Sequence, residues 1–135
     1  MVTVYRLQNP YGIGPYTCHA VMDNDIDASS SPRRPNAGDE YPLMVNGKEH
    51  NLSDFNSYFR DMNLCNVNYR IFGFISLEQL YNWFSIDEIK KMNKSHRVAI
   101  HTFNVDKKKI LHGTTQIVFY ANPIRGKYLE GFDYL

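Results

Sequence analysis

The segment YRIFGFISLEQLYNWF, residues 69–84, predicts a short buried strand that turns directly into a helix. Its first half is mostly apolar and aromatic, as in a strand. Ser76 follows, and Ser76-x-x-Gln79 is a capping-box pattern that marks the start of a helix. The apolar residues that follow at helical spacing are Leu77, Leu80, Tyr81 and Phe84. We therefore expect the helix to begin at this serine.

Helices are also predicted on both sides of this segment. Before it, a helix is expected over about residues 52–63, behind Asn51-x-x-Asp54 as its cap. Its apolar residues at helical spacing are Leu52, Phe55, Phe59 and Met62. After the segment, Ser85-x-x-Glu88 repeats the capping-box pattern, which predicts a further short helix after a bend.

Strands are predicted at both ends of the chain. Residues 2–7 alternate between two faces, with Arg6 on the face of Val2 and Val4. Residues 97–105 alternate in the same way, and a charged turn at 106–109 precedes strands expected at 110–113 and 115–121. We expect residues 1–135 to form a single α+β domain whose mainly antiparallel sheet comes from both chain ends.

Two segments are predicted to be irregular. Residues 9–15 hold two glycines and two prolines, which indicates a loop or a pair of turns. Residues 23–47 are rich in Asp, Asn, Ser, Pro and Gly without sustained periodicity, so we expect a long polar loop. A loop of this length either carries function or is mobile.

Composition limits the classes of function. The chain has 135 residues with 15 basic and 14 acidic side chains, so no overall charge steers it towards a polyanion. The five histidines are scattered without a metal-binding spacing, and no metal site is expected. Neither a signal peptide nor an apolar run of about 20 residues is present, so we expect a cytoplasmic protein.

Local basic clusters are candidates for nucleic-acid binding. They lie at Arg33-Arg34, Lys90-Lys91 and Lys107-Lys108-Lys109. Acidic residues next to the last two indicate a solvated helix face and a solvated turn instead. A nucleic-acid partner is therefore not expected.

Three polar side chains on or beside apolar strands are candidates for chemistry: Arg6, Ser76 and Gln116. A charged arginine in an apolar strand must point to solvent or meet a partner, because burial of an unpaired guanidinium is unfavourable. Ser76 is also explained by helix capping, and Gln116 by a solvent-facing strand position. Gly12-x-Gly14 is either a plain turn or a close approach for a phosphate group.

Four blocks of the chain resemble small proteins of phages and prophages. The most specific runs from Phe72 to Phe84. The others are Val4-Tyr5-Arg6, Gly12-x-Gly14-Pro15-Tyr16 and Gln116-Ile117-Val118-Phe119.

The order of Arg6, Ser76 and Gln116 is also similar to ADP-ribosyltransferases of the Arg-Ser-Glu type. That resemblance implies that Arg6 grips a phosphate of NAD, that Ser76 orients the pocket, and that Gly12, Gly14 and Tyr16 also contact the cofactor. Gln116 stands where the family has a glutamate. An amide cannot supply the negative charge that stabilises the positive charge on the ribose in the transition state. A carboxylate elsewhere in the chain, such as Glu78, would have to supply that charge instead.

Two hypotheses of different class follow. The first is a non-catalytic phage protein that binds a host protein, such as an inhibitor of a bacterial defence component of the anti-CRISPR kind. The second is an enzyme that uses NAD to modify a host target. Gln116 favours binding over catalysis.

Overall fold

The computed structural model describes residues 1–15, 43–45, 48–50, 55–113 and 115–135. Tyr16 and most of the predicted 23–47 loop lie outside these residues. The end of that predicted loop, β2 (Leu43–Val45), pairs with β3 (Lys48–His50) in an antiparallel hairpin that we had not predicted.

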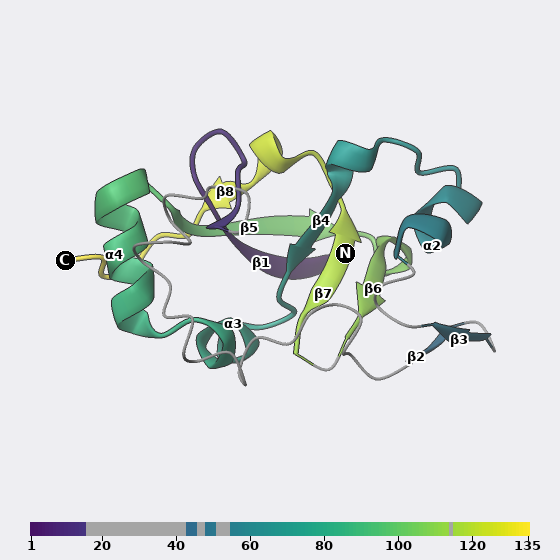
Figure 1. Ribbon diagram of the computed structural model, residues 1–135, viewed down its shortest axis with the longest axis horizontal. Coiled ribbons are helices and arrows are strands. Elements are labelled where there is room, and N and C mark those ends of the chain that lie inside the picture. The colour runs from purple at the N-terminus through teal and green to yellow at the C-terminus, as the bar shows by residue number, and fades with distance from the viewer. Residues whose placement is uncertain (16–42, 46–47, 51–54, 114) are drawn as a thin grey trace.

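The first sheet is built from both ends of the chain. β1 (Val2–Gln8) pairs antiparallel with β5 (Ala99–Val105) along its whole length, and β8 (Lys127–Tyr128) pairs with the other edge of β5. The order is β1-β5-β8. Figure 1 shows the long β1 and β5 ribbons side by side across the middle of the molecule.

The second sheet has the order β4-β7-β6 and is also antiparallel. Its strands are β4 (Arg70–Gly73), β7 (Ile117–Tyr120) and β6 (Ile110–His112). The two sheets are joined where Tyr5 and Phe74 exchange backbone hydrogen bonds of 2.8 and 2.7 Å.

A hydrophobic core lies between the two sheets. Phe103 of β5 contacts Phe119 of β7 with ring centroids 5.1 Å apart. The buried members of this core are Val4, Ile71, Phe103, Val105, Ile110, Ile117 and Phe119. Each such side chain contributes about 1.5–3 kcal/mol when fully buried.

The helices cover the remaining apolar faces. α3 (Leu77–Trp83) and α4 (Ile86–His96) pack over one end of the first sheet, and α2 (Phe55–Asp61) lies at the opposite end of the molecule (Figure 1). Phe59 of α2 packs against Leu111 and Val118 of the second sheet.

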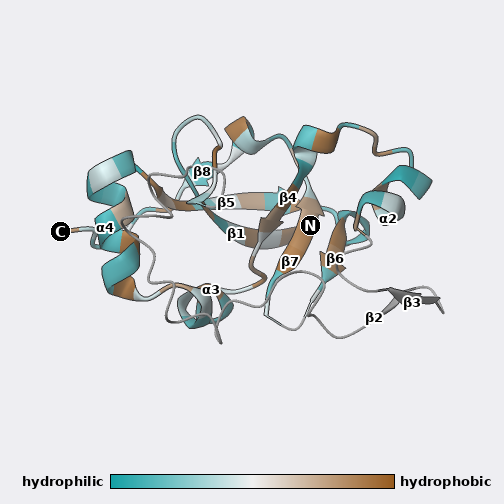
Figure 2. Ribbon diagram, in the orientation of Figure 1, coloured by the Kyte–Doolittle hydropathy of each residue, from teal (hydrophilic) through white to brown (hydrophobic). Residues whose placement is uncertain are grey.

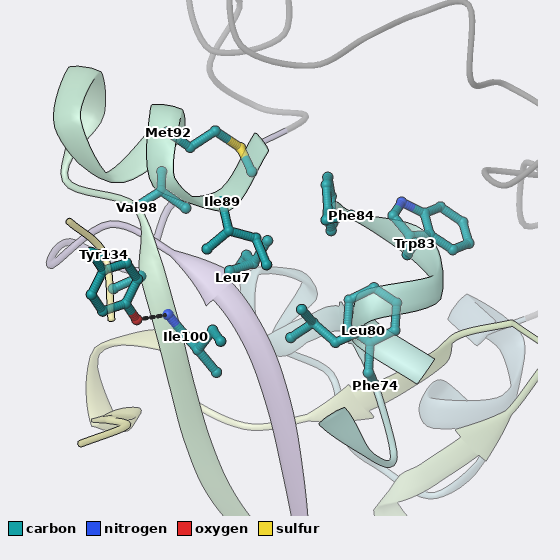
Figure 3. Close-up of a cluster of buried hydrophobic side chains, with 11 residues drawn as sticks. Leu7, Phe74, Leu80, Trp83, Phe84, Ile89, Met92, Val98, Ile100 and Tyr134 are labelled. Carbon is teal, nitrogen blue, oxygen red and sulfur yellow. Dashed lines mark hydrogen bonds between the residues drawn. The ribbon is translucent and has the colours of Figure 1, made fainter. Parts of the chain in front are cut away.

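The largest core cluster lies beneath α3 and α4 (Figure 3). Its buried members are Leu7, Phe74, Leu80, Trp83, Phe84, Ile89, Met92, Val98, Ala99, Ile100 and Tyr134. Tyr134 comes from the C-terminal tail, and its hydroxyl accepts a hydrogen bond of 2.9 Å from the Ile100 backbone N–H.

The predicted α+β class is confirmed, and several boundaries differ for local reasons. The helix expected over 52–63 is observed from Phe55 to Asp61, with residues 51–54 outside the described part. The strand expected from residue 97 begins at Ala99, because Arg97 ends α4 in the left-handed conformation (φ 60°). The strand expected from residue 115 begins at Ile117, because Gly113 donates a hydrogen bond to the Gln116 carbonyl and closes a turn.

Three short 3₁₀ helices occur in the connections of the described part of the chain. They are η5 (Val67–Tyr69), η6 (Lys107–Lys109) and η7 (Pro123–Arg125). The predicted charged turn at 106–109 is thus η6, capped by the Asp106 carboxylate. None of the helices in the described part of the chain is long and apolar enough to cross a membrane.

Candidate functional site

Arg6 connects three separate segments of the chain. Its Nε donates to Gln8 Oε1 at 3.0 Å, and its Nη1 donates to the Phe72 carbonyl of β4 at 2.8 Å. Its Nη2 makes a longer contact of 3.4 Å with the Gly12 carbonyl, in the loop after β1. The planar fork of a guanidinium suits it to this role, because its donors point in several fixed directions at once.

Gln8 extends this network to the C-terminal part of the chain. It follows Arg6 on the same face of β1, since alternate residues of a strand share a face. Its side chain is buried, and Nε2 donates to the Pro123 carbonyl at 2.8 Å. Arg6 and Gln8 together therefore hold the loop after β1, β4 and η7 in one arrangement.

The loop after β1 packs closely against this network. Gly12 has φ +81°, and a Cβ added there would lie 2.6 Å from Pro123 Cβ. A Cβ at Gly14 would lie 3.0 Å from Arg6 Nη2. Both glycines thus allow close approach, to η7 in one case and to the guanidinium in the other.

Asn9 fixes the conformation of the same loop. Its Oδ1 accepts hydrogen bonds from the backbone N–H groups of Tyr11 and Ile13, at 2.9 and 3.0 Å. The Asn9 backbone N–H also donates to the Ile13 carbonyl at 2.9 Å. An asparagine that folds back onto its own backbone in this way stabilises a tight turn.

The surroundings of Arg6 are neutral in the described part of the chain. Its hydrogen bonds go to the oxygens of one amide side chain and two backbone carbonyls. Desolvation by burial lowers the pKa of Arg6 to about 10, which still leaves it charged at neutral pH. The sequence suggested either solvent or an anionic partner, whereas the partners found are carbonyl oxygens.

His101 lies directly opposite Arg6 in the β1–β5 pair. Its side chain is buried, and Nδ1–H donates to the Ala99 carbonyl at 3.1 Å. Burial lowers the pKa of His101, the hydrogen bond to Ala99 opposes this shift, and the charge of Arg6 lowers it further. The folded protein therefore favours neutral imidazole at this position.

This shift predicts a loss of stability in mild acid. Above the unfolded pKa of about 6.5 the contribution of His101 is complete, and it falls as the pH drops towards the lower folded pKa, because the unfolded chain then binds the proton more readily. Burial lowers the pKa of His112 too, which adds a change of the same sign. We expect His101→Gln to reduce, but not abolish, the fall in urea midpoint between about pH 7 and pH 5. An unchanged fall would contradict this account of His101.

Ser76 has the capping role that its sequence pattern predicted. Its Oγ accepts a hydrogen bond of 3.0 Å from the Gln79 N–H. Gln79 Oε1 accepts from the Ile75 N–H at 2.9 Å, one residue before the position expected in a capping box. At Ser85 the full capping box is present.

Substitution of Ser76 separates capping from chemistry. Ser76→Ala is expected to lower the free energy of unfolding by about 1 kcal/mol. Ser76→Asp is expected to lower it by much less, because aspartate caps helices equally well. Chemical denaturation measures both, and Ser85→Ala serves as a reference for the loss of a cap. If Ser76→Asp is as unstable as Ser76→Ala, the hydroxyl has a role beyond capping.

Gln116 lies in the turn before β7 and is buried, not solvent-facing. None of the hydrogen bonds among the described residues joins Arg6 to Ser76 or to Gln116. Glu78, the alternative carboxylate, is exposed in the first turn of α3. Tyr16 falls outside the described residues. Within the described part of the chain, no cluster of His, Cys, Asp and Glu could hold a metal ion.

Gln8 and His101 are two buried polar neighbours of Arg6 that were not predicted from the sequence. One signal for Gln8 was present, because it continues the face of Val2, Val4 and Arg6 by one residue. His101 gave no such signal, since its position opposite Arg6 depends on the pairing register of two strands far apart in the sequence.

Comparison with known proteins gives one result. Residues 1–127 match the model of a protein family described as Bacteriophage T4 Y00F protein. No curated protein and no solved structure matches the chain.

Proposed function

This chain belongs to the Bacteriophage T4 Y00F protein family, and on that premise we propose that it acts without catalysis, by binding a host protein. The observation that carries the proposal is the use of Arg6. Its guanidinium connects β1, β4 and the loop after β1 through neutral oxygens. A guanidinium whose N–H donors already bind carbonyl oxygens does not need a phosphate as a partner. It can instead hold the segments of a binding surface in place.

The other two residues of the transferase-like set fit the same proposal. Ser76 caps α3 through its hydroxyl, and Gln116 is an amide in a buried turn. Neither supplies the negative charge that departure of nicotinamide requires. The NAD-dependent alternative therefore lacks an observation in its favour, and we make it the outcome that would overturn the proposal.

The proposed target is a component of a bacterial defence system, of the kind that anti-CRISPR proteins inhibit, in the host cytoplasm. A small protein that binds without catalysis acts by covering a surface that its target needs. A defence complex that must contact other molecules is a target for which such coverage is sufficient.

Affinity capture from host lysate, combined with a labelling assay, tests the proposal. The tagged protein is expected to retain a host protein in stoichiometric amount, and to transfer no label from NAD to any lysate protein. Arg6→Lys is the key variant for the second assay, because it keeps the charge and removes the planar fork of the guanidinium. Label transfer by the wild type that disappears in Arg6→Lys would establish the enzyme and overturn the binding proposal.

A further inference from the structure

Exposed apolar side chains gather on two loops that touch each other. Tyr11 and Ile13, in the loop after β1, are 75% and 43% exposed, and Ile124 of η7 is 67% exposed. The loops meet at Gly12, where an added Cβ would lie 2.6 Å from Pro123 Cβ and 3.4 Å from the Ile124 nitrogen. We call this surface, formed by Tyr11, Ile13 and Ile124, the two-loop surface. Figure 1 shows the purple loop beside the yellow-green turn that precedes β8, and Figure 2 shows an apolar segment in that turn.

Single exposed apolar residues are normal, but adjacent ones in fixed positions indicate an interaction site. The loop after β1 is fixed by Asn9, and η7 is fixed by Asn122, whose Oδ1 accepts from the Ile124 N–H at 3.2 Å. Arg6 and Gln8 hold the two loops from beneath. A surface held in this way loses little conformational entropy when it binds.

The charged side chains of the two segments that carry the two-loop surface are basic. Residues 1–15 contain no acidic side chain, and neither do residues 115–129. Arg125 follows Ile124 directly, Lys127 lies two residues further on, and both are exposed. Exposed Arg125 and Lys127 therefore favour an acidic partner at this surface, although the whole chain is nearly neutral.

We infer that the two-loop surface binds an acidic protein segment that also carries large apolar side chains. This inference rests on the proposed function and names the face that performs it. The aliphatic side chains of Ile13 and Ile124 favour a protein over a nucleic acid, because nucleic-acid surfaces offer phosphates and stacking faces and little for isoleucine to contact.

The test uses a displayed library of random peptides, selected on the purified full-length protein. Selected peptides are expected to combine Asp or Glu with Trp, Phe or Leu. Their affinity is expected to fall by at least about tenfold in Ile124→Ser, as for a central interface residue, and to fall in Ile13→Ser and Arg125→Glu as well. Ile86→Ser is the matched control, because Ile86 lies on α4 with 42% exposure, almost equal to that of Ile13.

Several outcomes would overturn the inference. They are failure to select any peptide, selection of peptides without acidic residues, and equal binding by Ile124→Ser and wild type. Binding of a fluorescent oligonucleotide that Arg125→Glu abolishes, without any selected peptide, would reassign the face to nucleic acid. If Ile124→Ser and Ile13→Ser still capture the host protein, the proposed function is retained. Only the assignment of binding to the two-loop surface is then overturned.

Discussion

Gly73→Ala is expected to lower the free energy of unfolding by about 2–3 kcal/mol, near the upper end of the range for overpacking. An added Cβ at this position would lie 2.6 Å from the Tyr5 carbonyl oxygen and 2.7 Å from Phe119 Cε1. The Tyr5 carbonyl accepts the hydrogen bond from Phe74 that joins the two sheets, so it cannot move away without breaking that junction. Loss of a few kcal/mol is a large part of the 5–15 kcal/mol that stabilises an ordinary domain.

Gly131→Ala is the control for this prediction. Gly131 has φ +90°, but an added Cβ would meet no atom within 4 Å. Its substitution therefore measures backbone strain alone, which we expect to be about 1 kcal/mol. If Gly73→Ala is no more destabilising than Gly131→Ala in chemical denaturation, the close contact at the sheet junction is not as described.

Arg6→Lys is expected to destabilise the protein by about 1–3 kcal/mol, the range for buried polar groups that lose their partners. An ammonium group keeps the charge but cannot reach Gln8, Phe72 and Gly12 together, because it lacks the planar fork of the guanidinium. The Phe72 carbonyl and the Gln8 side chain would then lose donors in a partly buried region.

Arg125→Lys is the matched control. Arg125 is exposed in η7, and the same substitution there is expected to change stability by less than about 0.5 kcal/mol, as at other surface positions. Equal stability of Arg6→Lys and Arg125→Lys in urea denaturation would mean that the network around Arg6 contributes nothing to the fold.

Local patterns in the sequence were sufficient to predict much of the fold. The capping serines at residues 76 and 85 both begin helices where expected. The alternation of residues 2–7 and 97–105 produces the two longest strands of the described part of the chain. These features depend on hydrogen bonds within a few residues or on simple periodicity, so a single chain carries the information.

The features that were missed depend on contacts between distant segments. β8 has only two residues and forms because β5 offers an edge, so no pattern in the tail predicts it. The partner of Arg6 in β4 is a backbone carbonyl 66 residues away, which every residue type possesses. The sequence therefore pointed to Arg6, Gly12 and Gly14 as residues of the candidate site, but not to the role of Arg6 in connecting the segments.

Arg6 positions the loops that carry the two-loop surface, through its own contact with Gly12 and through Gln8. Amide hydrogen exchange of wild type and Arg6→Lys tests it most directly, at the N–H groups of Gly12, Ile13 and Ile124, with Ile89 in α4 as the internal reference. These three loop amides have their own hydrogen bonds to Asn9 and Asn122. We predict faster exchange at the loop amides in Arg6→Lys while Ile89 stays protected, since local opening precedes global unfolding. Unchanged exchange at the loops, or equal acceleration at Ile89, would contradict this role of Arg6.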